Sequence, residues 1–126
     1  MPGAEGEGDG WPADLATLAE AGAGRPVWGR QTAELNLNLM VLEGDDGAIG
    51  EHVNAEVEVL ILGIAGCGDV EVDGETHALR PRQAIVIPRG ARRAMRATGG
   101  RFAYLTCHRR RPGLWPRGMS PRGMKT

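Results

Sequence analysis

One stretch of alternating residues, EHVNAEVEVLILG at positions 51–63, carries the side chains best suited to chemistry. Its polar residues His52, Asn54, Glu56 and Glu58 stand at every second position. An extended chain points alternate side chains to one face, so the spacing predicts a face with an imidazole, an amide and two carboxylates. Imidazole and carboxylate groups transfer protons or bind divalent metals. This face is therefore a metal site, a small-molecule site or a water-exposed strand surface.

Further polar residues alternate along two other segments. In ELNLNLMV, Asn36 and Asn38 alternate with leucines, so this row faces either solvent or a cavity. Near the end of the chain, Tyr104 and His108 share one face of a predicted strand. There His108 either reaches the opening of the fold or only precedes an arginine run. Asn38, Tyr104 and His108 are predicted ligand-binding residues.

The elements that must position these residues are mostly short strands. WPADLATLAEAG has Pro12 near its start, Leu15 and Leu18 at helical spacing, and Gly22 at its end, which predicts one short helix. After it, segments with a period of two are separated by the turn sequences GDDG, AGCG, DG, RPRQ and ATGG. About eight short strands after one helix predict an all-β sandwich or barrel.

Composition divides the chain into four parts around one domain. We predict a disordered lead over 1–10, a short helix and the segment leading into the barrel over 11–31, the barrel over 32–111, and a basic tail over 112–126. No apolar run reaches the roughly 20 residues that a membrane-spanning helix needs, and no signal peptide is evident. Because the chain has only two cysteines, we predict a cytoplasmic protein with free thiols.

Charge is unevenly distributed along the chain, although the net charge is -1. Residues 101–126 contain seven basic side chains and no acidic one, whereas the N-terminal half is acidic. Clustered arginines bind phosphate groups, so one interpretation of the tail is a nucleic-acid arm. Because the whole chain is not basic and no recognition helix precedes the tail, we expect no nucleic-acid binding. The tail is instead predicted to lie against acidic parts of its own chain or of a partner.

The run GCGDVEVDGETHALRPRQAIVIPRGARRAMRA, at residues 66–97, resembles the second half of a cupin domain. It contains the glycine-rich turn, the Val-Asp-Gly-Glu hairpin and the Ile-Pro-x-Gly turn of that family at the expected spacing. The resemblance covers residues 32–108. It implies the cupin double-stranded β-helix, which is a jelly-roll barrel, here preceded by a short N-terminal helix.

Cupins commonly hold a metal with three histidines and one glutamate, and this chain departs from that set. In the resemblance, His52 matches the first histidine, Asn54 the second and Arg93 the last. The glutamate falls on Glu58 or on Val59, depending on the spacing. An amide is a weak ligand, and a guanidinium donates no lone pair and repels a dication. We therefore expect no metal cofactor; the alternative is iron, zinc, nickel or manganese bound by His52 and Glu58.

The same residues favour a small-molecule site. His52 and Glu58 are the predicted catalytic residues, with His52 acting as acid or base. Asn54 and Glu56 are predicted to line the pocket. Arg93 is predicted either to hold a carboxylate of the ligand or to pair with Glu56 or Glu58. The predicted function is a small-molecule-binding cupin, or a metal-independent enzyme of the isomerase or cyclase type.

Two alternatives stay open on the sequence. One is a metallo-cupin with nonstandard ligands, similar to a dioxygenase. The other is a noncatalytic dimeric scaffold that acts through its basic tail on an acidic partner. In either case the strand edges of an open barrel favour a homodimer.

Overall fold

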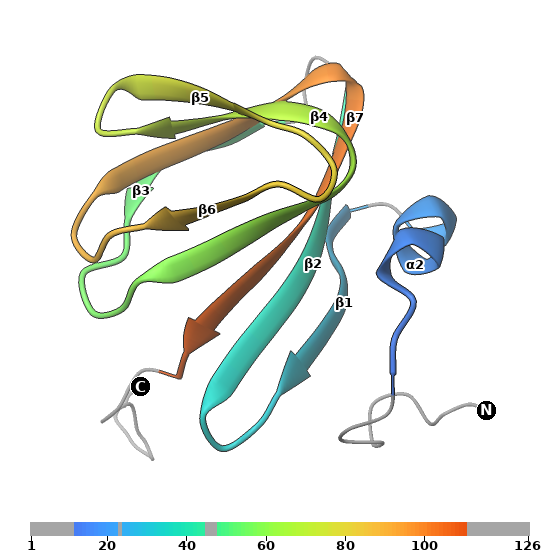
Figure 1. The fold of residues 1–126 in the computed structure, drawn as a ribbon, viewed down its shortest axis with the longest axis horizontal. Coiled ribbons are helices and arrows are strands. Elements are labelled where there is room, and N and C mark those ends of the chain that lie inside the picture. Colours follow the sequence, from blue (N-terminus) through green and yellow to red (C-terminus); the bar gives the residue numbers. More distant parts are fainter. Residues whose placement is uncertain (1–11, 23, 45–47, 111–126) are drawn as a thin grey trace.

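The computed structural model describes residues 12–22, 24–44 and 48–110, without the side chains at 24, 25, 48, 49, 51 and 52. This part of the chain forms one helix and a seven-stranded antiparallel sheet (Figure 1). The elements are α2 (Leu15–Ala21), β1 (Gly24–Gln31), β2 (Leu35–Glu43), β3 (Ala48–Val53), β4 (Val59–Val72), β5 (Glu75–Leu79), β6 (Ala84–Ile87) and β7 (Arg92–Arg109). The predicted lead over 1–10 and tail over 112–126 lie outside the described residues.

The strands join into one curled sheet whose order is β1-β2-β7-β4-β5, with β3 also paired to β7 and β6 to β4. The long strands β4 and β7 pair from Leu60 opposite Cys107 to Val72 opposite Arg93, and they bend across the molecule together (Figure 1). The predicted all-β fold with a short N-terminal helix is confirmed. The sheet begins at β1, earlier than the barrel boundary predicted at residue 32.

Two segments predicted as turns, AGCG and ATGG, lie inside β4 and β7, so those predictions were wrong. The pairing of β4 with β7 shifts between Gly66, opposite Phe102, and Gly68, opposite Ala97, so the extra residues of this irregularity lie on β7; Gly66 has a φ of +69°. A Cβ at Gly66 would collide with the carbonyl of Arg101 on β7. Glycine here therefore bends a continuous strand and lets two backbones approach, because no side chain is in the way.

The two faces of β2 pack into two separate cores. Met40 and Leu42 point into the barrel, whereas Leu39 and Val41 lie on the outer face beneath α2. The barrel core is formed by buried side chains from the strands and their loops, namely Leu42, Val57, Val59, Ile61, Val70, Leu79, Ile87, Ala91, Met95, Ala97, Phe102 and Tyr104. Both faces of β2 are therefore covered along that half of the strand.

Helix α2 covers only part of the outer face of the sheet. Asp14 caps its start, accepting a hydrogen bond from the Thr17 amide at 3.1 Å. At its end, the Arg101 guanidinium donates to the Gly22 carbonyl at 2.5 Å and ties the helix to β7. Ala19 packs against the outer rows of β2 and β7. The remaining outer face, toward the ends of these strands, is not covered by a helix of the described chain (Figure 1).

Candidate functional site

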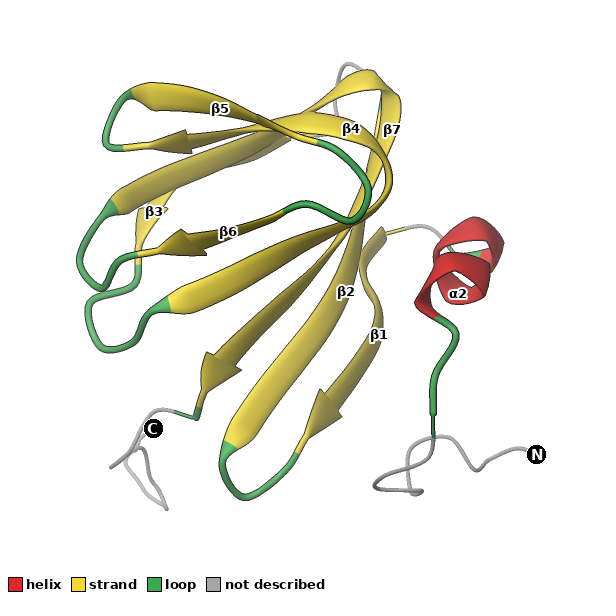
Figure 2. Cartoon of the chain, viewed as in Figure 1, coloured by secondary structure: helices red, strands yellow, loops and turns green. Residues whose placement is uncertain are grey.

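The stretch 51–63 is not one strand, so the prediction of a single polar face was wrong. β3 ends at Val53 and β4 begins at Val59, with a loop between them (Figure 2). The loop turns at Asn54, whose side-chain oxygen accepts from the Glu56 amide at 3.4 Å. Its carbonyl accepts from the amide of Gly90 at 2.8 Å. Asn54 therefore ends the strand by bonding the backbone, and the alternation is interrupted there.

The side chains that follow Asn54 divide between the barrel and the solvent. Val57 and Val59 are buried in the barrel core, whereas Glu56 and Glu58 are exposed. Asn54 itself is half-buried. The interior position at the start of β4 is thus occupied by Val59, and Glu58 points away from it.

Arg93 lies on the interior side of the sheet. It stands two residues before buried Met95 on β7 and is half-buried. Its backbone partner on β3 is His52, so the two predicted positions are neighbours in the ladder. The side chain of His52 lies outside the described residues.

Polar residues replace apolar ones on the interior face at one end of the barrel. Asn36 pairs with His108 and Asn38 with Thr106, so four polar side chains form two adjacent cross-strand pairs, which we call the polar row. The Asn36 amide nitrogen lies 3.4 Å from His108 Nε2. Three of the four are half-buried and Thr106 is buried. The next pair, Met40 with Tyr104, returns to the apolar core.

Two contacts fix the His108 ring in the polar row. His108 Nδ1 lies 2.8 Å from the Arg109 carbonyl oxygen, which can only accept, so Nδ1 carries a proton. In the neutral ring Nε2 is then an acceptor, and the Asn36 amide can donate to it. The structure therefore brings together Asn38 and His108 of the predicted residues, and adds Asn36 and Thr106. Tyr104 is buried among core side chains, with its ring 5.0 Å from that of Phe102.

The Asn38 side chain differs from the others in the polar row. Within the described residues, its amide group makes no hydrogen bond; the bond from Thr106 Oγ1, at 3.5 Å, goes to the Asn38 backbone carbonyl. A Cβ on the neighbouring Gly29 would lie 3.1 Å from Asn38 Oδ1, so glycine leaves room beside it. A half-buried amide thus faces the barrel without a partner in the described part of the chain.

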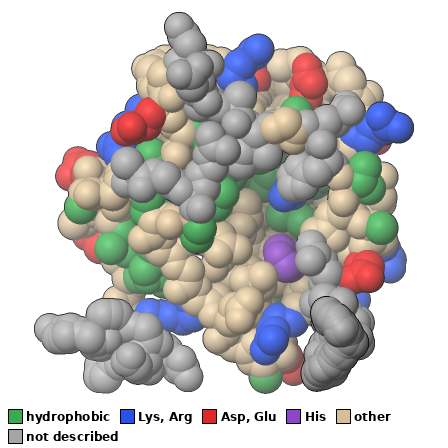
Figure 3. Space-filling view, turned by 180° about the vertical axis from the view of Figure 1, so that it is seen from behind, with side chains coloured by type: hydrophobic (Ala, Val, Ile, Leu, Met, Phe, Trp, Pro, Cys, Tyr) green, Lys and Arg blue, Asp and Glu red, His purple; other side chains and the backbone are tan. Residues whose placement is uncertain are grey.

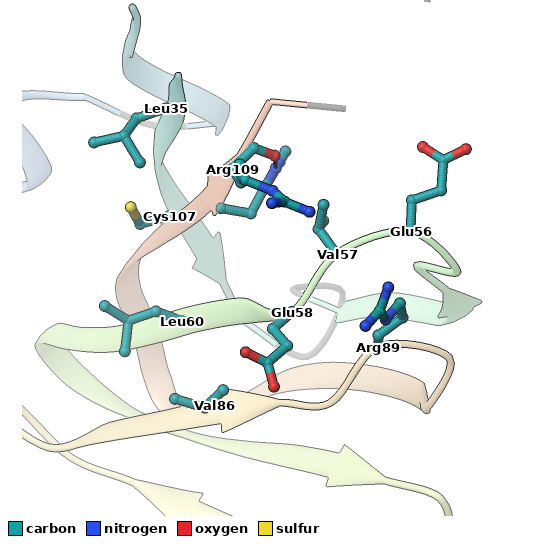
Figure 4. Close-up of a pocket in the computed structure, with 10 residues that line it drawn as sticks. Leu35, Glu56, Val57, Glu58, Leu60, Val86, Arg89, Cys107 and Arg109 are labelled. Atoms are coloured by element: carbon teal, nitrogen blue, oxygen red, sulfur yellow. Dashed lines mark hydrogen bonds between the residues drawn. The ribbon is translucent and has the colours of Figure 1, made fainter. Parts of the chain in front are cut away.

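A cleft of about 480 Å³ opens at the rim of the barrel, mostly on the outer side of the sheet, and of the polar row only His108 lines it. It is lined by charged and polar side chains, Glu56, Glu58, Arg89, His108 and Arg109, and by Leu35, Val57, Leu60, Val86 and Cys107. Figure 4 shows Glu58 and Arg89 at one end of it and Arg109 reaching toward Val57. No hydrogen bond or ion pair engages the side chains of Glu58, Arg89 or Arg109 among the residues that the structure describes. Sequence reasoning missed both arginines.

Two expectations from composition can be compared with the described residues. Cys67 and Cys107 are free thiols, as predicted. The described part of the chain contains no helix long and apolar enough to cross a membrane.

An antiparallel jelly-roll barrel with a cleft at its open rim defines the class of protein. The chain belongs to the cupin family, because the family model described as "Cupin domain" matches residues 38–108. This confirms the resemblance seen in residues 66–97. No curated protein matches the chain in sequence.

Solved structures show the same fold. The BH2720 protein of Bacillus halodurans is 18% identical, with a TM-score of 0.69 over 90% of this chain and 89% of that one. The TT1209 protein of Thermus thermophilus is 24% identical, with a TM-score of 0.67 over 80% of this chain and 98% of that one. KdgF of a Halomonas species is 18% identical, with a TM-score of 0.56 over 68% and 77% of the two chains. At these identities the likeness shows the fold alone.

The residues at the family's metal positions do not fit a divalent metal. The side-chain oxygen of Asn54 accepts a hydrogen bond from the Glu56 amide in its own loop. Val59, the interior candidate for the glutamate position, is buried and has no donor atom. Arg93 brings a positive charge to the position of the last histidine. Among the described residues, no three His, Cys, Asp or Glu side chains are grouped as metal ligands.

Proposed function

We propose that this cupin binds a small polar molecule bearing a carboxylate at the end of the barrel that carries the polar row. The observation that carries the proposal is the Asn38 amide, half-buried and facing the barrel without a hydrogen bond inside the described residues. Because the amide is only half-buried and makes no hydrogen bond inside the described residues, water or a ligand can supply its partner. A molecule with hydroxyl or carbonyl groups fits that requirement.

The charges beside the polar row support an anionic ligand. Arg109 pairs with Leu35, so it starts on the face opposite His108, and all three of Arg109, Arg89 and His108 line the cleft at the rim. A guanidinium binds a carboxylate through two parallel hydrogen bonds, which fixes the orientation of the ligand. Arg93, on the interior side of the sheet, was predicted for this role and stays a second candidate for it.

Acid–base chemistry without a metal is the reaction type we propose for the site. Nδ1 of His108 donates to the Arg109 carbonyl, so the lone pair is on Nε2, where it accepts from the Asn36 amide and would take a proton once a ligand displaces that contact. A histidine positioned in this way can accept a proton from a bound ligand at Nε2 and return it. The predicted catalytic roles of His52 and Glu58 stay predictions, as does a contact of the tail at 112–126 with an acidic partner.

Binding is tested with a panel of hydroxy, keto and sugar carboxylic acids and their matched amides, by thermal shift and calorimetry. We expect at least one carboxylate to bind and its amide not to bind. Arg109→Gln is expected to weaken that binding at least about tenfold, because a charged hydrogen bond is lost. Arg80→Gln, an exposed arginine on the loop after β5, is the matched control and should bind like wild type. Equal binding of acids and amides would contradict the proposal.

Metal analysis tests the metal-independent part of the proposal. We expect the wild-type protein, purified without a chelator or a histidine tag, to contain no stoichiometric metal by mass spectrometry, because the donor set does not fit one. Stoichiometric iron, zinc, nickel or manganese that is lost in both His52→Ala and Glu58→Ala would contradict the metal-independent part of the proposal. The protein would then be a metallo-cupin with nonstandard ligands.

A further inference from the structure

The polar row continues onto β1, which is an edge strand of the sheet. Gln31 on β1 pairs with Asn36, which in turn pairs with His108. Residues directly opposite one another in a sheet point to the same face, so Gln31 lies in line with Asn36 and His108. The Gln31 side chain is exposed and makes no hydrogen bond within the described residues. A third amide therefore stands beside the two in the polar row, where a ligand can reach it.

Gly29 on the same strand leaves space beside the Asn38 amide. The two residues are opposite each other in the ladder of β1 and β2, and a Cβ at Gly29 would lie 3.1 Å from Asn38 Oδ1. The φ angle of Gly29 is not positive, so its backbone conformation does not require glycine. Gly29 is exposed, so this space opens to solvent. The absence of a side chain at Gly29 therefore makes Asn38 accessible from the side of β1.

The end of β7 holds the hairpin of β1 and β2 in place. Just beyond β7, the Arg110 amide donates to the Glu34 carbonyl at 2.8 Å, and Arg110 Nη1 donates to the Thr32 carbonyl at 3.1 Å. Thr32 directly follows Gln31, so these bonds fix the backbone of Gln31 relative to His108. A hydrogen-bonding group that is positioned before the ligand arrives binds with a smaller loss of entropy.

The spacing and chemistry of these side chains indicate the kind of ligand. Neighbouring strands lie about 4.8 Å apart, so the line from His108 through Asn36 to Gln31 spans about 10 Å, roughly the length of a six-carbon acid. An amide both donates and accepts hydrogen bonds, as a hydroxyl group does, and it carries no charge. On the face shown in Figure 3, most charged side chains lie toward the edge, and a histidine lies among uncharged groups. A row of amides fits several hydroxyl groups along one carbon chain.

We propose that Gln31 and Gly29 extend the binding site along β1, so that the preferred ligand is a polyhydroxy acid of about six carbons. The carboxylate of this ligand lies at the rim beside His108 and Arg109, and its hydroxyl groups follow the polar row toward Gln31. A short acid bound at the rim does not reach β1, so Gln31 sets the preference for the longer ligand. This preference rests on the proposed function, because it requires a carboxylate site at the rim.

Calorimetry of the full chain with glycerate and gluconate, a three-carbon and a six-carbon polyhydroxy acid, tests this preference. We expect wild type to bind gluconate at least about tenfold more tightly than glycerate, because more hydrogen bonds form. Gln31→Met keeps the length of the side chain without its amide, and it should weaken gluconate binding about tenfold and leave glycerate binding unchanged. Gly29→Ala should also weaken gluconate binding, because its methyl group crowds Asn38. Thr76→Met, exposed on the edge strand β5, is the matched control and should bind both acids like wild type.

Failure of this preference and failure of the proposed function give different results. If glycerate and gluconate bind equally, or if Gln31→Met binds gluconate like wild type, the carboxylate site stands and its extension onto β1 is wrong. If Gln31→Met weakens both acids equally, Gln31 does not select the length of the ligand, which also overturns the extension. If no acid binds, or acids bind no better than their amides, the proposed function is wrong and so is the extension.

Discussion

Gly68→Ala is expected to cost about 3 kcal/mol of unfolding free energy, because a side chain there overpacks the centre of the barrel. A Cβ added at Gly68 would lie inside van der Waals contact with the ring of Phe102 on the neighbouring strand. That ring is fully buried and stacks near Tyr104, so it has no free space to move into. Urea denaturation followed by circular dichroism measures the loss.

A double-mutant cycle separates this steric cause from other effects of the substitution. Phe102→Ala alone is expected to lose about 3–5 kcal/mol, since it leaves a cavity in the core. In that background Gly68→Ala should cost much less, because its methyl group enters the vacated space. Gly99→Ala is the control: a Cβ there meets nothing within 4 Å, so stability should change by less than about 0.5 kcal/mol. Equal costs of Gly68→Ala in both backgrounds would show that the Phe102 ring is not the obstacle.

Alternation predicted the strands well where both faces of a strand have a distinct environment. β2 alternates between barrel core and helix-covered core, so its period of two survives in the structure from Asn36 to Leu42. The same period at 51–63 predicted one continuous strand, which was wrong, because the Asn54 side chain hydrogen-bonds the backbone and β3 ends there. A sequence pattern cannot distinguish a continuous strand from two strands joined by a short loop when the polar residue that turns the chain also fits the alternation.

Glycine pairs were misleading for a related reason. AGCG and ATGG have the composition of turns, yet they lie inside β4 and β7, where the pairing of the two strands shifts register. Whether a glycine reverses the chain or bends it depends on the strand lying opposite, such as Arg101 opposite Gly66. That neighbour is more than thirty residues away in sequence and is not part of the local pattern.

The candidate site was predicted in part. The alternation in ELNLNLMV pointed to Asn38 and the alternation on the last strand pointed to His108, and both now stand in the polar row. Arg89 and Arg109 were missed, since one follows a proline in a turn and the other opens the arginine run of the tail. Arg89 follows the end of β6 and Arg109 ends β7, and both strand ends lie at the rim of the barrel. The spacing of residues along the sequence does not predict that these two ends lie together. Thr106 shares the alternation of Tyr104 and His108, a signal that was available.

Asn38→Leu is expected to abolish most ligand binding while leaving the barrel at least as stable as wild type. The amide makes no hydrogen bond within the described residues, so its removal should break no contact of the fold. A leucine there extends the apolar row of Met40 and Leu42 and should add about 1 kcal/mol of stability. Loss of a hydrogen bond to the bound carboxylic acid should weaken affinity about tenfold.

The two readouts distinguish a binding residue from a structural one. Calorimetry with the best carboxylic acid of the panel gives the affinity, and urea denaturation of the unliganded protein gives the stability. Thr76→Leu, an exposed polar residue on β5, is the control for adding a leucine to a strand, and it should bind like wild type. A destabilised Asn38→Leu protein would mean that the amide serves the fold through water. Unchanged affinity in a stable Asn38→Leu protein would place the ligand elsewhere, because the amide would then make no contact with it.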